Sequence, residues 1–222
     1  MTSIRVAALA VSFSALYVAN LRGQSAGRDL PLGFRSLAGV TLNRDSAATI
    51  RAKLGNAGER RVAVGHDRYL RWCFVPASRS SSTLVELMSN AGDMGTPGQE
   101  LNVIRLRAEA PSKDREGCAQ LRASADLSTP AGLRLGLSAA NIEALLGRST
   151  RRDADSLIYY FDAREFLRPG SPEYEAWNTP ENREACFEAG PPYANVDASV
   201  IVLLRDGRAA EIRIERYDQS VC

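Results

Sequence analysis

Several residue types are scarce in this chain of 222 residues, among them cysteine, which occurs four times, lysine, which occurs twice, and histidine, which occurs once. His66 is the only histidine and no CxxC pair occurs, so the ligand spacing of a zinc site is missing. The motifs GxSxG, HExxH, GxGxxG and the P-loop are also absent, which removes the usual sequence signals of hydrolases, metalloproteases and nucleotide-binding enzymes. We therefore expect no catalytic residue, no cofactor and no metal.

The remaining candidates for catalysis are weak. His66 and Asp67 could act as a general base, and Ser80, Ser81 or Ser82 could act as a nucleophile. However, the serine-rich run is typical of a flexible turn, and the histidine directly precedes a predicted strand. A small secreted hydrolase is the weakest alternative.

The N-terminal residues form the pattern of a secretory signal peptide. Arg5 precedes a largely apolar run, Val6 to Ala19, and small residues follow at Gly23 and Ser25. We expect residues 1–25 to be removed, with a buried helix or an uncleaved anchor as the alternative. The run is shorter than the roughly 20 residues of a membrane span. No cysteine precedes Cys73 that could carry a lipid, so we expect no membrane span, no lipid anchor, and a periplasmic or secreted protein.

The chain without this segment is close to neutral. Removing Arg5 and Arg22 lowers the number of basic residues from 28 to 26, which equals the 26 acidic residues. A protein that binds nucleic acid must neutralise phosphates with a basic surface. The charge balance therefore argues against nucleic acid as a partner.

The sequence contains an internal repeat, with an offset of 93 residues at its first glycines and 92 at its second. Gly39-Val40-Thr41-Leu42, Ile50, Leu54-Gly55 and the strand Tyr69 to Trp72 recur as Gly132-Leu133-Arg134-Leu135, Ile142, Leu146-Gly147 and Leu157 to Tyr160. Such a self-match indicates two copies of one small unit. We place the first repeat at 36–118, a connector at 119–131 and the second repeat at 132–222.

Each repeat is predicted to contain a short helix followed by an antiparallel sheet. Ser46 or Asp45 and Ser138 are N-cap candidates, and Gly55 and Gly147 stand where helices end. The helix faces expected in the core carry Ile50 and Leu54, and Ile142, Leu145 and Leu146. Alternating apolar residues predict strands at Tyr69–Val75, Thr83–Met88, Leu101–Ala108, Leu157–Phe161, Ser199–Leu204 and Ala210–Tyr217, the last two joined by an Asp206-Gly207 hairpin. The fold class is α+β, with two tandem repeats of short helices on three- to four-stranded antiparallel sheets.

The second repeat contains an insertion, residues 162–197. Ser171-Pro172-Glu173 and Thr179-Pro180-Glu181 each have the N-cap, proline and acid of a helix start. Tyr174 and Trp177 add aromatic surface. These rings either pack the insertion onto the core or form hot spots of an interface.

The four cysteines divide evenly between the repeats. An even number of cysteines in an exported chain indicates disulfides, and four cysteines allow three pairings. The repeat favours pairing within each unit, as Cys73–Cys118 and Cys186–Cys222.

The second repeat resembles a known family. The run from Gly132 to Gly147, then Tyr159 to Phe161, then Val200 to Gly207 is similar to the SmpA/BamE family of outer-membrane assembly lipoproteins. It also resembles one half of the β-lactamase-inhibitor protein (BLIP) family, in which two such units stand in tandem with a disulfide in each. This resemblance implies a tandem fold whose sheets form a concave face that grips another protein.

We therefore expect an exported, non-enzymatic protein-binding module of BLIP/BamE-like type, with another protein as its partner. The alternative is an envelope structural or assembly factor for outer-membrane components. The outward sheet face and the insertion are the candidate contact surface. The candidate residues are Arg71, Arg105, Arg107, Tyr174, Trp177, Arg213 and Tyr217.

Overall fold

The computed structural model describes residues 28–55, 60–64, 67–77, 82–90, 100–121, 126–170, 172–185 and 193–221. The predicted signal peptide lies outside these residues. So do Cys186 and Cys222, and their pairing stays a prediction that non-reducing peptide mapping can test. Among the described residues, no helix combines the length and the apolar character needed to cross a membrane.

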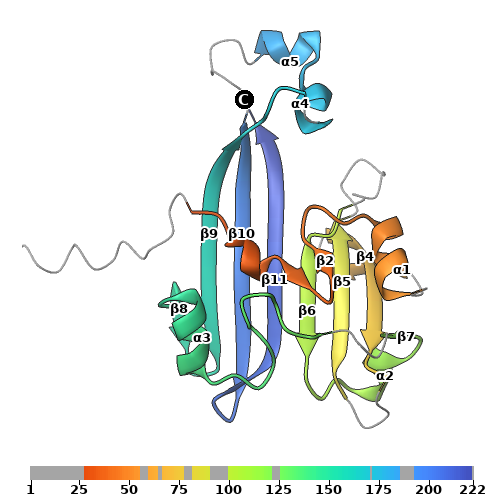
Figure 1. Cartoon of the computed structure of the whole chain (residues 1–222), viewed down its shortest axis with the longest axis vertical. Helices are drawn as coiled ribbons and strands as arrows, with labels where there is room; N and C mark the ends of the chain where they lie inside the picture. The colour runs from red at the N-terminus through yellow and green to blue at the C-terminus, as the bar shows by residue number, and fades with distance from the viewer. Residues whose placement is uncertain are drawn as a thin grey trace, which may run out of the picture.

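One broad sheet dominates the described chain (Figure 1). Its neighbours follow the order β3-β4-β5-β6-β11-β10-β9-β8, every adjacent pair is antiparallel, and β7 pairs in parallel with β4. The predicted α+β class is therefore confirmed, whereas the sheet is mixed rather than antiparallel throughout because of the β4–β7 pair. The strands are β3 (Arg60–Val64), β4 (Asp67–Val75), β5 (Leu84–Asn90), β6 (Val103–Arg107), β7 (Ala119–Gln120), β8 (Arg151–Asp153), β9 (Ser156–Phe166), β10 (Tyr193–Arg205) and β11 (Arg208–Val221).

The sheet consists of two four-stranded runs that meet at their last strands. β3 to β6 form the first run and β8 to β11 the second, and β6 pairs with β11 in the register Ile104↔Ile214. A helix precedes each run: α1 (Ala47–Leu54) the first and α3 (Ala139–Leu146) the second. The two halves therefore share one sheet rather than packing as separate sheets.

Both helices have the caps that the sequence indicates. The Ser46 side chain accepts a hydrogen bond from the Thr49 N–H, and Ser138 accepts one from the Asn141 N–H. The helices end at glycines with positive φ, 105° at Gly55 and 85° at Gly147, a conformation that side chains with a Cβ rarely adopt.

The predicted helix faces are right except at one residue. Ile50, Leu54 and Ile142 are buried, and Leu146 is half-buried against the core. Leu145 is 39% exposed, so its assignment to the core is wrong. The eight-residue helix aims Ile142 at the sheet, and Leu145, which lies about 60° from that direction, turns toward solvent.

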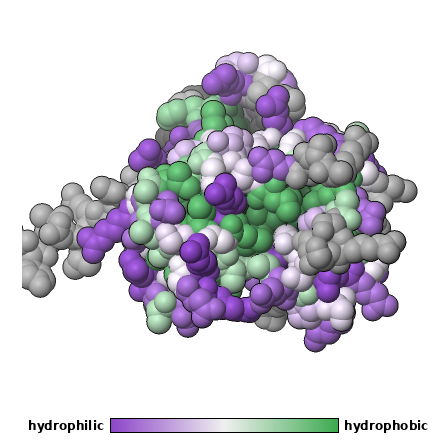
Figure 2. All heavy atoms as spheres, turned by 60° about the horizontal axis from the view of Figure 1, so that its bottom comes forward, coloured by the Kyte–Doolittle hydropathy of each residue, from purple (hydrophilic) through white to green (hydrophobic). Residues whose placement is uncertain are grey.

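The main hydrophobic core lies against one face of the sheet. It includes Trp72 and Phe74 from the first half and Val200, Ile212 and Ile214 from the second, all at most 1% exposed. Alternation along each strand places these side chains on the core face and the intervening residues on the opposite face. Seen from below, apolar surface gathers in the middle of the molecule between hydrophilic rims (Figure 2).

The insertion is shorter than the sequence indicates. β9 continues through Phe166 and β10 begins at Tyr193, so both ends of the predicted 162–197 segment are paired strand. Between them lie α4 (Pro172–Trp177) and α5 (Pro180–Ala185), each beginning at its predicted proline. Both helices lie beyond the upper ends of β9 to β11 (Figure 1).

The lead-in before the first helix crosses the core side of the second half (Figure 1). It contains a short 3-10 helix, η1 (Leu32–Phe34), and the hairpin β1 (Ser36–Leu37) and β2 (Val40–Thr41). Arg216, only 4% exposed, donates to the Asp29 carboxylate at 3.1 Å and to Glu165 at 3.1 Å. Burial by itself raises the pKa of Asp29, but the bonds and charge of Arg216 outweigh it and hold that pKa below its usual value. This ion cluster ties the lead-in to the sheet.

Candidate functional site

The candidate site lies on the face of the sheet opposite the core, which we call the open face. One row of side chains crosses it from strand to strand: Cys73 of β4, Glu86 of β5, Arg105 of β6, Arg213 of β11 and Ile201 of β10 are successive cross-strand neighbours. This row passes through the junction of the two halves. Groups far apart in the sequence therefore become neighbours only because β6 pairs with β11.

A disulfide covers one end of the open face. Cys73 and Cys118 are bonded, with their Cα atoms 4.9 Å apart, as predicted. The bridge brings α2 (Ser112–Arg115) onto β4, and Cys73 is 2% exposed although it points away from the main core. A small satellite core forms there from Cys73, Leu84 and Ala110.

Glu86 is the centre of a charged network on this face. The residue is 4% exposed. One carboxylate oxygen lies 2.7 Å from Arg71 Nε, and the other lies 3.2 Å from Arg107 Nε and 3.6 Å from an Arg105 terminal nitrogen. A buried carboxylate needs such partners because its desolvation alone costs several kcal/mol. Three guanidinium groups supply them.

The network extends in both directions from Glu86. Arg105 donates through Nε to Glu211 at 2.7 Å, which joins β6 to β11, and Arg107 donates to Asp114 of α2 at 2.9 Å. Arg213 forms an ion pair with Glu215 on the same strand. Burial lowers the pKa of Arg105, but the hydrogen bond and charge of Glu211, with Glu86 and Asp114, reverse this effect and raise it above the usual arginine value.

Two clefts lie side by side along the network. The first, the cation cleft, has a volume of about 360 Å³. The second, the acidic cleft, has a volume of about 280 Å³. Residues of β11 line both, because Arg213 borders the first and Glu215 and Tyr217 border the second. The cation cleft is lined by Arg60, Val62, Arg71, Glu86, Met88, Arg105, Arg107, Lys113, Asp114 and Arg213, and the acidic cleft by Tyr160, Phe161, Asp162, Asp197, Ala198, Ser199, Glu215 and Tyr217.

The structure brings together five of the seven candidate contact residues. The four arginines, Arg71, Arg105, Arg107 and Arg213, line the cation cleft, and Tyr217 lines the adjacent cleft. Tyr174 and Trp177 lie on α4, beyond the ends of the long strands (Figure 1), where their rings contact each other with centroids 6.1 Å apart. The candidate surface therefore divides into a sheet face and a separate aromatic tip.

The candidate contact residues include no acidic member of the network. Glu86 and Asp114 were not predicted, although each pairs with a predicted arginine, whereas alternation along the last predicted strand places Glu211 on the outward face. A signal was present for Glu86. It is the one charged residue in the apolar strand from Leu84 to Met88, and an acid in such a strand indicates a buried partner.

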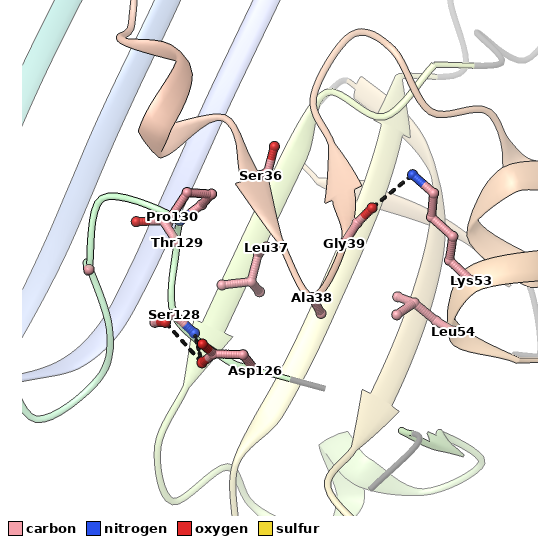
Figure 3. A pocket seen from close by; sticks show the side chains of 11 residues that line it. Ser36, Leu37, Ala38, Gly39, Lys53, Leu54, Asp126, Ser128, Thr129 and Pro130 are labelled. Atoms are coloured by element: carbon pink, nitrogen blue, oxygen red, sulfur yellow. Dashed lines mark hydrogen bonds between the residues drawn. The ribbon is translucent and has the colours of Figure 1, made fainter. Parts of the chain in front are cut away.

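A third cleft, of about 620 Å³, lies on the core side between the β1–β2 turn, the end of α1 and residues 126–132 (Figure 3). Lys53 Nζ donates to the Gly39 carbonyl at 2.7 Å and to Asp45 at 2.8 Å. Asp126 accepts from the N–H and hydroxyl of Ser128 at 2.9 and 2.8 Å. These polar groups close local turns: Asp126 and Ser128 are two residues apart and their hydrogen bonds are exposed, and Lys53 joins the end of α1 to the β1–β2 turn.

The weak catalytic candidates can be placed only in part. His66, Ser80 and Ser81 lie outside the described residues, and Ser82 is half-buried before β5. Its carbonyl accepts a hydrogen bond from the Ala110 N–H at 2.9 Å. Within the part of the chain that the structure describes, no group of three or more His, Cys, Asp or Glu side chains is arranged to hold a metal ion.

No protein-family model, curated protein or solved structure matches the chain. The described residues thus define the class by geometry alone: an α+β protein built on one broad mixed sheet. One face of that sheet covers the core. The other carries a half-buried network of arginine and carboxylate groups.

Proposed function

We propose that this chain is an exported, non-enzymatic protein-binding module of BLIP/BamE-like type that binds its partner on the open face. The observation that carries the proposal is the network around Glu86. A sheet face that merely meets water carries extended, solvated side chains, whereas here the side chains of Arg71 and Arg107 are 16% and 19% exposed. They are held in fixed positions in the lining of the cation cleft. Preorganised arginines beside tyrosines are typical of interface centres.

Three further features support the same function. The Cys73–Cys118 disulfide favours an oxidising compartment outside the cytoplasm. The equivalent order of helix and four strands in both halves is what a duplicated unit would produce, and we propose that the halves are tandem repeats. Joining them edge to edge creates an open face wider than either half supplies.

The test is capture of a partner from a bacterial envelope extract with the oxidised protein as bait. Arg213→Ala removes a half-exposed guanidinium from the open face, and Trp177→Ala tests the aromatic tip. Arg134→Ala, at an exposed arginine outside both clefts, is the matched control. We expect Arg213→Ala to weaken capture by at least about 2 kcal/mol, as a hot spot does, with the fold intact. Equal capture by Arg213→Ala and the control would place binding elsewhere.

The identity of the captured protein separates the alternatives. A defined soluble enzyme supports an inhibitor, whereas outer-membrane proteins support the envelope assembly factor. If no protein is captured under any condition, a binding module is the wrong class and hydrolysis becomes the next hypothesis.

A further inference from the structure

Resting on the proposed function, we infer the chemistry of the partner: its contact segment carries an aspartate or glutamate side chain that enters the cation cleft. The cleft would hold this carboxylate among the arginines of β4, β6 and β11. The inference follows from the charge balance of the lining, from its remaining hydrogen-bond donors and from the acidic cleft beside it.

The charge balance of the cation cleft is positive. Six cations line it, and four carboxylates among the described residues are available to pair with them: Glu86 and Asp114 within the lining, and Glu211 and Glu215 through Arg105 and Arg213. Two cations are therefore in excess. The surplus matches Arg60 and Lys113, which are exposed at the rim. A partner that brings negative charge is attracted to this rim.

The arginines also have N–H donors that the network does not use. A guanidinium group carries five N–H bonds in a planar fork that fits a carboxylate. In the described part of the chain, Arg213 engages its Nε with Glu215, and Arg105 engages its Nε with Glu211 and one terminal nitrogen with Glu86. Both side chains are 30% exposed. Terminal nitrogens therefore face the cleft and can donate to a ligand.

The rim is held in place by the disulfide-linked segment. The Arg60 guanidinium lies directly over Gly117, where a Cβ would stand 2.1 Å from its terminal nitrogen. Gly117 has a φ of 70° and lies next to Cys118. The lack of a side chain at this turn is what admits the guanidinium to the edge of the cleft.

A single carboxylate fits this cleft better than a phosphate group or a nucleic acid. The floor is the buried carboxylate of Glu86, which opposes a ligand carrying two negative charges more strongly than one carrying a single charge. The acidic cleft begins two residues along β11, at Glu215, and repels a second anion. A row of phosphates would have to cross it, whereas a protein segment need present acid at only one point.

The experiment is an NMR titration of the isotope-labelled, oxidised full-length exported protein with a capped tetraglutamate peptide. Inorganic phosphate at equal concentration and a tetralysine peptide are the comparison probes. We expect saturable shifts of the Nε–H signals of Arg105 and Arg213 with tetraglutamate alone. The double variant Arg60→Gln/Lys113→Gln should weaken this binding on the order of tenfold, because it removes the excess charge. The double variant Arg134→Gln/Arg148→Gln removes the same charge outside the cleft and should bind as the unaltered protein does.

Four results would overturn the inference. Shifts spread over the whole surface, or weakened equally by both double variants, would mean unspecific attraction. Phosphate binding as strong as that of the peptide would mean a general anion site. Self-association through the same arginines, without a peptide effect, would assign the face to a second copy of the chain. Capture of the partner could depend on Arg213 and yet not be inhibited by excess tetraglutamate. That result would contradict the carboxylate assignment but not the proposed binding function.

Discussion

Replacing Glu86 by glutamine is expected to destabilise the protein far more than its position on the outer sheet face suggests. The substitution keeps the size of the side chain, removes its charge and replaces one acceptor oxygen with an NH₂ donor. Arg107 and Arg105 retain Asp114 and Glu211 as partners, whereas the one contact left to Arg71 among the described residues is a long one, 3.3 Å, to the carbonyl of Asp114.

The magnitude follows from this partial compensation. Breaking a fully buried ion pair costs roughly 3–5 kcal/mol, because one charge is left without a partner. The Arg71 side chain is 16% exposed and can recover some hydration, so we expect about 3 kcal/mol. For a chain of this size, this corresponds to a fall in melting temperature of roughly 6–12 °C.

The assay is thermal unfolding followed by calorimetry under oxidising conditions. Glu109→Gln is the matched control, because Glu109 pairs with Arg205 while their side chains are 68% and 63% exposed. An exposed pair contributes at most about 1 kcal/mol. If Glu86→Gln melts within about 2 °C of the control, the arginines do not depend on Glu86 and the preorganised network is not real.

Three further predictions concern the fold. Cys73→Ser should lower the free energy of unfolding by roughly 2–4 kcal/mol in denaturant titrations, and an unchanged midpoint would contradict a stabilising bridge. Leu146→Asp should cost several kcal/mol because it places a charge against the core, whereas Asn141→Asp, at an exposed position, should cost little; equal melting temperatures would show that the helix phase is wrong. Tyr159→Phe should not destabilise, because the Tyr159 hydroxyl is buried without a hydrogen-bond partner among the described residues. Burial raises the pKa of Tyr159 to about 12, so the unfolded chain ionises first, and the advantage of the variant should grow as pH rises above about 10. A stability difference that stays constant up to pH 12 would contradict that shift.

The fold could be predicted from the sequence where it depends on residues close together in the chain. The caps at Ser46 and Ser138, the glycines that end both helices and the Asp206-Gly207 hairpin depend on neighbouring residues alone, and all are present. Strand ends were predicted less well. β10 starts at Tyr193, six residues before the predicted Ser199, because pairing with β9 and β11 extends a strand past the point where its apolar alternation fades. The edge strands β3 and β8 were not predicted, since each is short and rich in arginine.

The site could be predicted only in part. Alternation along β4, β6 and β11 correctly placed Arg71, Arg105 and Arg213 on the face opposite the core. It could not show that they are paired. Arg105 and Glu211 are 106 positions apart, and their contact depends on the register between β6 and β11, which no local pattern states. Arginines that the sequence presents as a solvated row are therefore members of a balanced network.

That balance changes what an interface on the open face can use. A partner that had to extract Arg71 from Glu86 would lose as much as it gained, because a buried pair loses several kcal/mol when one member leaves. Binding strength must instead come from donors that the network leaves over and from the rim charges of Arg60 and Lys113. The paired residues hold the arginine side chains in position and add little attraction for the partner. The Arg105–Glu211 pair joins this network across the junction of β6 and β11. The geometry that holds Arg105 and Arg213 side by side is therefore a property of the joined sheet, which neither half possesses alone.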